Sequence, residues 1–185
     1  MLRLQGDRVV LRDFVPQDRE PFLALEGDEA MFTYMKFRID RGWESVRLPR
    51  LLEEAHLDPR PSYNLVVEDE EGFSGWAGID RIERTDSGQF GWYLRSDRWG
   101  RGYATEVTRL LLDFGFSVLH RSTMWATADP DNLASRRVLE KFGLTSRGLT
   151  SPVHTWRGTR PRVLFTIDAE QWRTRFQAPG PSEGC

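Results

Sequence analysis

Cysteine is almost absent from this sequence of 185 residues: Cys185, at its end, is the single one. This scarcity excludes an internal disulfide framework and a cysteine-rich zinc site, and a terminal thiol is a poor candidate nucleophile. Lysine is nearly absent too, with two residues against 24 arginines. We attribute that bias mainly to a GC-rich bacterial genome rather than to function.

A strong charge of one sign and long apolar runs are also lacking. The formal net charge of −2 at pH 7 argues against a nucleic-acid partner, because nucleic-acid-binding surfaces are normally clearly basic. No apolar run reaches the ~18 residues of a membrane span, and no signal-peptide pattern is visible. We therefore expect a cytoplasmic protein with no membrane partner.

What is present fits one globular domain with a sizeable core. The sequence is 39% hydrophobic and 29% charged, which is typical of a folded domain of this length. We expect a single domain over residues 1–176. Residues 177–185 are rich in Pro, Gly and Ser and are expected to form a disordered tail.

The residue pattern predicts an α+β fold in which helices flank a mixed, mostly antiparallel central sheet. Apolar stretches between residues 63 and 94, separated by two turn segments, indicate an antiparallel meander. A helical period over residues 107–118, followed by an apolar stretch at 122–128, indicates a strand–helix–strand crossover. The expected strands are 8–14, 63–68, 73–83, 89–94, 122–128, 144–149 and 163–167, and the expected helices are 16–25, 44–56, 107–118, 133–142 and 169–176.

A glycine-rich segment at 99–106, WGRGYATE, is the most informative stretch. It follows the strand-like run 89–94 and precedes the helix-like run 107–118. Small residues at such a junction let backbone N–H groups approach a ligand, and the helix N-terminus adds partial positive charge. The segment therefore predicts a cradle for a phosphate or pyrophosphate. A glycine-rich turn before a surface helix is the alternative interpretation.

Two further segments accompany this loop: RVVLRD at 8–13, and the stretch 128–144, which contains Asn132, Ser135 and Phe142-Gly143. The three motifs together resemble the GCN5-related N-acetyltransferase (GNAT) superfamily, and within it the ribosomal-protein N-acetyltransferase-like branch. The resemblance covers residues 5–168, although Trp99 stands where many members have Gln or Arg. It implies the GNAT fold, with two splayed strands, and an N-acetyltransferase that transfers an acetyl group from acetyl-CoA to a primary amine by direct attack in a ternary complex.

The resemblance also implies a site for acetyl-CoA, or another short acyl-CoA, and needs no metal. The pyrophosphate would lie on the loop amides with help from Arg101 and Arg98, the pantetheine arm would follow the strand before the loop, and Ser135 would protonate the leaving thiolate. The alternatives are a plain helix cap for Asn132, an exposed helix position for Ser135 and surface charges for the arginines. The implied binding residues are Trp92, Tyr93, Leu94, Trp99, Gly100, Arg101, Gly102, Tyr103, Ala104, Asn132 and Ser135.

A general base is needed because an alkylamine is largely protonated at neutral pH. In the branch a glutamate often stands eleven residues after the glycine that is Gly143 here, and His154 occupies that position. A neutral imidazole can accept the proton directly or through water. His154 is therefore the expected catalytic base, with Asp80, Glu83 and Glu106 as alternatives.

The acceptor is the part that the sequence leaves open. It is an amine-bearing small molecule or a protein N-terminus, and the protein is a monomer or a homodimer. A non-catalytic acyl-CoA-binding sensor or partner protein of the same fold is the alternative function. Aromatic residues are expected to line the acceptor side of the cleft, two or three of them touching substrate: Phe37, Trp43, Trp76, Tyr93 and Trp156.

Overall fold

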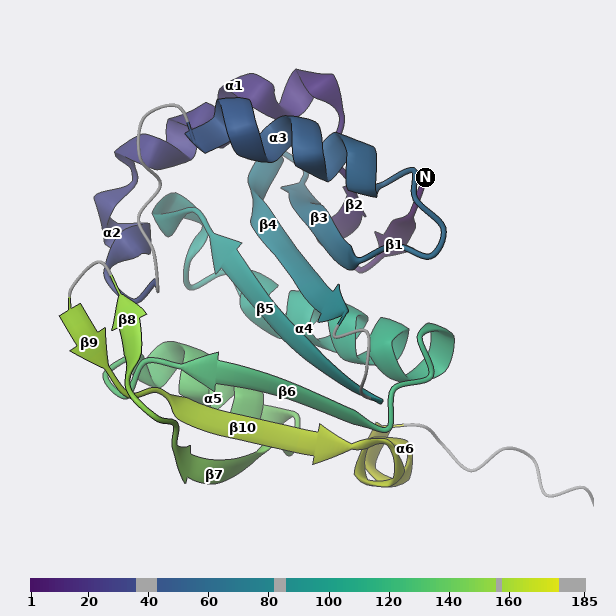
Figure 1. Cartoon of the computed structure of the whole chain (residues 1–185), viewed down its shortest axis with the longest axis vertical. Helices are drawn as coiled ribbons and strands as arrows, with labels where there is room; N and C mark the ends of the chain where they lie inside the picture. Colours follow the sequence, from purple (N-terminus) through teal and green to yellow (C-terminus); the bar gives the residue numbers. More distant parts are fainter. Residues whose placement is uncertain (36–42, 82–85, 156–157, 177–185) are drawn as a thin grey trace, which may run out of the picture.

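The computed structural model describes residues 1–35, 43–81, 86–155 and 158–176 (Figure 1). The expected tail at 177–185 lies outside these residues. Eight strands form one sheet in the order β1-β2-β3-β4-β5-β6-β10-β7, and β8 and β9 form a separate hairpin. The strands are β1 Arg3–Gln5, β2 Val10–Asp13, β3 Ser62–Asp69, β4 Gly72–Arg81, β5 Ser87–Leu94, β6 Thr123–Ala128, β7 Thr145–Leu149, β8 Val153–Thr155, β9 Gly158–Arg160 and β10 Val163–Asp168.

Helices cover both faces of this sheet, which confirms the predicted α+β fold. They are α1 Arg19–Ala24, α2 Glu29–Phe32, α3 Trp43–Glu54, α4 Tyr103–Asp113, α5 Leu133–Lys141 and α6 Ala169–Phe176. Short 3-10 turns precede α1, follow it and precede the loop at 99–102, and a π-helical turn, Phe114–Val118, ends α4. Pairing is antiparallel throughout the main sheet except between β5 and β6, which are parallel.

Four differences from the sequence-based elements stand out. The predicted strand at 8–14 is shorter, and a preceding strand, β1, was missed; so was the β8–β9 hairpin. Each missed strand has only three residues, too few to show an alternating pattern. Helix α4 begins at Tyr103, earlier than predicted, because its first turn is supplied by the glycine motif itself.

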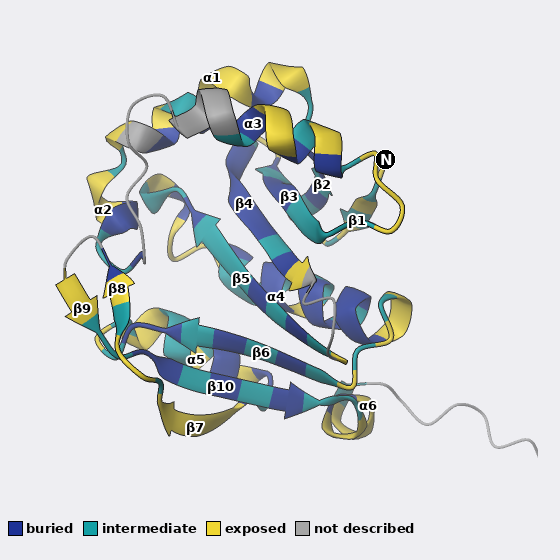
Figure 2. Ribbon diagram, in the orientation of Figure 1, coloured by how far each residue is buried: buried dark blue, intermediate teal, exposed yellow. Residues whose placement is uncertain are grey.

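Two hydrophobic clusters hold the helices against opposite faces of the sheet, because successive strand residues point to opposite sides. On β3, Leu65 and Val67 pack into the cluster under α4, α5 and α6, whereas Val66 packs into the cluster under α1, α2 and α3. Buried residues follow the central strands, and the edge strand β7 is exposed (Figure 2). The fold therefore has two separate layers around one sheet.

The parallel pair β5–β6 opens after a short contact. Register pairs run only from Ser87 with Thr123 to Gln89 with Trp125. Beyond them β5 stays paired to β4 as far as Leu94, and β6 stays paired to β10. The two strands therefore diverge toward their C-terminal ends and leave a wedge in the middle of the sheet (Figure 1).

Glu106 ties the N-terminal strand segment to this wedge. Its carboxylate accepts hydrogen bonds from Arg8 N at 2.7 Å, Val9 N at 3.1 Å and Arg8 Nε at 3.2 Å. The Arg8 guanidinium also donates to the carbonyl of Arg101 at 2.6 Å. Burial raises the pKa of Glu106, but these hydrogen bonds and the Arg8 charge outweigh it, so the pKa lies below its ordinary value. Glu106 is thus a structural residue of the loop motif.

Glu106→Gln is expected to lower the free energy of unfolding at pH 7 by about 1–2 kcal/mol, because charge-assisted hydrogen bonds become neutral ones. Since the folded-state pKa is depressed, this contribution is present above the unfolded-state pKa of ~4.3 and is lost as pH falls through the folded-state pKa. Urea unfolding of both proteins at pH 7 and at lower pH measures the difference. The exposed Glu140→Gln serves as a control with little effect; a Glu106→Gln difference that does not shrink with acid contradicts the assignment.

Candidate functional site

A cavity of about 580 Å³ passes through the wedge between β5 and β6. Its walls include the start of α4 and α5 from one face of the sheet, and residues around α2 and β4 from the other. It therefore joins the two layers of the fold. Of the residues expected to bind cofactor, the cavity is lined by Trp92, Tyr93, Leu94, Trp99, Gly100, Gly102, Tyr103, Ala104, Asn132 and Ser135.

The glycine loop shapes one end of the cavity. Gly100 and Gly102 have φ angles of +74° and +82°, in the left-handed region where only glycine is unstrained. Gly102 is the residue before α4, and its carbonyl accepts from Thr105 N and Glu106 N. The amides at the very start of α4 have no acceptor within the helix and carry the positive end of its dipole. This end of the cavity is suited to an oxygen anion.

The two arginines that the sequence offered for phosphate are engaged elsewhere. Arg101 donates to Glu71 Oε1 at 2.7 Å and is not among the cavity-lining residues. Arg98 lines the cavity, but it is buried and forms ion pairs with Glu71 at 2.9 Å and with Asp69 at 3.3 Å. Their side chains therefore anchor the loop to the β3–β4 turn, and the direct contact of Arg101 with phosphate stays a prediction.

The open edge of β5 presents backbone groups to the wedge. Arg95 N donates to Ser74 O across the β4–β5 ladder at 2.9 Å. Because backbone groups alternate in direction along an antiparallel strand, the N–H and C=O of Tyr93 also face β4, and those of Trp92 and Leu94 face the wedge. The Leu94 carbonyl there accepts from Trp99 Nε1 at 3.0 Å. An extended ligand could pair with the remaining groups as an added strand.

The start of α5 forms the facing wall. The Asn132 side chain accepts from Ser135 N at 3.0 Å and so caps α5, the alternative role that the sequence offered for it. Both residues line the cavity. Among the described residues the Ser135 hydroxyl has no hydrogen-bond partner, so it is available to a ligand.

Polar and aromatic residues line the end of the cavity toward α2 and β4. Trp76 and Tyr93 lie with ring centroids 4.6 Å apart. Burial raises the pKa of Tyr93; the charge of Arg162 opposes this and that of Asp80 adds to it. Phe37 and Trp156 lie outside the described residues, as does the side chain of Trp43. Of the five aromatic residues expected on the acceptor side, Trp76 and Tyr93 are thus the ones seen to line the cavity.

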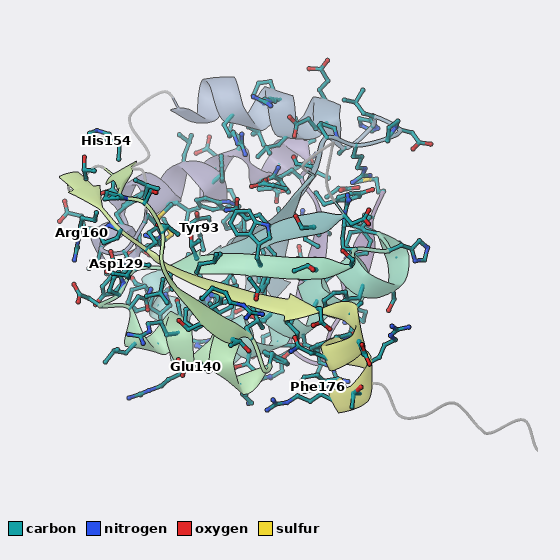
Figure 3. All side chains as sticks on the ribbon, turned by 60° about the horizontal axis from the view of Figure 1, so that its bottom comes forward. Tyr93, Asp129, Glu140, His154, Arg160 and Phe176 are labelled. Atoms are coloured by element: carbon teal, nitrogen blue, oxygen red, sulfur yellow. The ribbon has the colours of Figure 1, made fainter. Side chains whose placement is uncertain are left out.

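His154 is not brought to this cavity. It lies on β8, where its neighbour Thr155 is buried and His154 itself is exposed. Its Nδ1 is 3.5 Å from Thr159 Oγ1 on β9. Figure 3 shows it at the rim of the molecule, away from Tyr93. The geometry does not support a direct proton transfer from the cavity to His154, because alternation along β8 turns its side chain outward. Asp80, an alternative in the sequence, does line the cavity.

Sequence reasoning missed several polar residues of the same cavity. Arg162 is a buried arginine directly before β10, and Tyr34, Arg47, Asn64 and Gln89 also contribute to the walls. They come from five separate segments, and no local motif joins them. The one available signal was a charged residue beside the apolar run 163–167, which does not tell an inward arginine from a surface one.

Two further properties concern the described residues, namely metal binding and membrane crossing. No cluster of three or more His, Cys, Asp or Glu side chains in that part of the chain is placed to hold a metal ion. Nor does any helix within it have the length and apolar character needed to cross a membrane.

Comparison with known proteins gives consistent results. Residues 8–145 match the family model of the acetyltransferase (GNAT) domain. N-acetyltransferase p20 of Bacillus licheniformis is 22% identical over 152 residues, 80% of this chain and 85% of that protein. Spermidine N(1)-acetyltransferase of Escherichia coli is 21% identical over 169 residues, 89% of this chain and 90% of that protein. The structure of Mycobacterium smegmatis RimJ in complex with CoA-disulfide has a TM-score of 0.78 at 22% identity, covering 92% of this chain and 87% of that one.

Proposed function

The chain belongs to the GNAT acetyltransferase family and is an N-acetyltransferase, and from this premise we propose that it transfers an acetyl group from acetyl-CoA to a primary amine by direct attack within a ternary complex. One observation carries the proposal: a single cavity runs from the glycine loop, through the β5–β6 wedge, to a polar chamber on the other face of the sheet. Donor and acceptor can therefore approach the same point from opposite sides.

The donor half of the cavity fits coenzyme A. The N–H groups from Gly100 to Ala104 receive the pyrophosphate, whose charge is favoured by the α4 dipole. The pantetheine arm lies along β5 and pairs with the wedge-facing backbone of Trp92 and Leu94, with Asn132 on the opposite wall. A backbone N–H of this open edge donates to the thioester carbonyl oxygen as negative charge develops there.

Proton transfers complete the reaction. The attacking amine must first lose a proton, and we propose Asp80 as its acceptor, directly or through water, because it lines the cavity at the β4 side. Attack then forms the C–N bond, the C–S bond breaks, and the new amide nitrogen releases its second proton. The Ser135 hydroxyl, on a residue that lines the same cavity, donates its proton to the leaving thiolate and is reprotonated through water by the proton released from the nitrogen.

Ala104→Glu tests the donor site. An acidic residue in the first turn of α4 is compatible with the helix dipole but places negative charge where the pyrophosphate binds. We expect acetyl-CoA affinity, measured by calorimetry, to fall by at least about tenfold through charge repulsion. Leu133→Glu puts the same side chain in the first turn of α5 at an exposed position outside the cavity lining, and should leave affinity unchanged. A folded Ala104→Glu protein with wild-type affinity would falsify the assignment.

Ser135→Ala tests the thiolate step. If the hydroxyl acts as the general acid, kcat should fall roughly 10- to 100-fold while acetyl-CoA affinity changes little, since water partly replaces the proton donor. Thiol release and calorimetry on the same preparation separate the two effects. A loss of affinity with unchanged kcat would make Ser135 a binding residue instead.

The base is tested by comparing Asp80→Asn with His154→Ala. We expect Asp80→Asn to lower kcat by about 10²-fold and to remove the acidic limb of the pH–rate profile. His154→Ala should keep near-wild-type turnover with the same profile, because the imidazole faces away from the cavity. The opposite pattern would return the role to His154. Tight acetyl-CoA binding without turnover on any amine would instead favour the non-catalytic sensor.

A further inference from the structure

Arg162 is a buried arginine that has no counterion among the described residues. Only 7% of its surface is exposed, and it lines the cavity. Within the described part of the chain, its guanidinium donates to three neutral oxygens: to Thr127 Oγ1 at 3.2 Å, to Tyr34 O at 3.3 Å and to Thr127 O at 3.4 Å. All three hydrogen bonds are long, so the charge is held in place with little direct compensation.

No carboxylate lies within ion-pair distance of Arg162 in the described parts of the chain. Asp129 is the acidic residue whose charge reaches it, and Asp129 pairs with Arg160 at 3.6 Å. Burial lowers the pKa of Arg162 despite the opposing effects of Tyr93 and Asp129. Arg98, the other arginine that is buried among the described residues, shows the usual arrangement, with Asp69 and Glu71 as ion-pair partners. An unpaired buried charge is costly, and its retention in a cavity wall points to an anion that arrives with a ligand.

The free hydrogens of Arg162 suit an anionic group with two oxygens. A guanidinium has five N–H donors, and three are used, one on each nitrogen. Among the described residues this leaves one N–H on each terminal nitrogen. Two neighbouring donors of a planar guanidinium match the two oxygens of a carboxylate, or two oxygens of a phosphate.

This arginine belongs to the acceptor half of the cavity. On β6, Met124, Ala126 and Ala128 pack under α4 and α5, so Thr127 faces the other side of the sheet. Arg162 is held against Thr127 and the carbonyl of Tyr34, on the side opposite the glycine loop. An anion bound by Arg162 would therefore be distinct from the pyrophosphate of the donor.

We propose that the acceptor is a small amine carrying a carboxylate or a phosphate, and that this anionic group binds to Arg162. The proposal rests on the proposed function and adds the class of acceptor. Under this proposal the acceptor differs in charge from spermidine, the polycation for which one relative is named. A buried guanidinium repels a second positive charge on the acceptor.

Matched acceptor pairs test the proposal through turnover. L-amino acids are compared with their amides, and phosphoethanolamine with ethanolamine, with spermidine as the polycation; thiol release is expressed per unit of free amine. We expect kcat/KM to be at least tenfold higher for the anionic member of a productive pair, and the two kinds of pair separate a carboxylate from a phosphate. Arg162→Met should abolish the preference, and Arg162→Lys should keep part of it. Arg137→Met removes an exposed arginine outside the cavity lining and should change nothing.

A second measurement needs no turnover. With saturating CoA present, so that the donor site is filled, acetate, glycine or inorganic phosphate should raise the melting temperature saturably above a chloride control of equal ionic strength. The rise should be absent in Arg162→Met and retained in Arg137→Met. Stabilisation by these anions without turnover on any amine would overturn the proposed function but support the anion site.

Three results would overturn the inference. The first is a wild-type preference for spermidine or for the neutral member of each pair. The second is an anionic preference that survives in Arg162→Met. The third is anion-induced stabilisation that is equal in wild type and Arg162→Met, or absent from both. If Arg162→Met only lowers the melting temperature and leaves both readouts as in wild type, the arginine is a structural link between Tyr34 and Thr127.

Discussion

The separation of β5 from β6 after three register pairs is the constraint on which the site depends. A continuous sheet would pair the inner backbone groups of both strands and close the path between its faces. Here each strand keeps its outer partner, so the wedge forms without loss of the sheet: β4 holds β5, and β10 holds β6. The unpaired edge of β5 is what remains for an extended ligand, because exposed strand edges bind by adding a strand.

The glycine loop needs support because its left-handed glycines give it little rigidity of their own. That support comes from residues distant in sequence. Glu106 accepts a hydrogen bond from the backbone of the segment before β2, and the Arg8 side chain donates one to the carbonyl of Arg101. Arg98 forms an ion pair with Asp69. The charged side chains of the motif thus hold the loop in place through their hydrogen bonds and ion pairs. The loop amides stay available to a ligand. This is also why net charge near the loop is a poor guide to phosphate contacts.

Local patterns predicted the parts of the fold that local interactions determine. The glycine loop lies where the sequence placed it, and Asn132 caps α5. The meander followed from its apolar stretches and the two turn segments between them. Other features depend on distant contacts: the outward face of His154 follows from how the short β8–β9 hairpin sits, and no periodicity in three residues reveals it. The inward turn of Arg162 follows from Thr127 and Tyr34, far away in the chain.

The two halves of the cavity differ in the same way, one being set by local sequence and the other by contacts between distant segments. Its donor side is built from continuous segments, 92–104 and 132–139, whose backbone groups do much of the binding and which a sequence motif can specify. Its acceptor side is assembled from side chains on α2, α3, β3, β4 and β5 and from Arg162, directly before β10. Each of those segments can change without disturbing the wedge or the loop. Acceptor choice can therefore vary within one fold while the donor site stays constant, and it must be argued from buried charges such as Arg162 rather than from the fold.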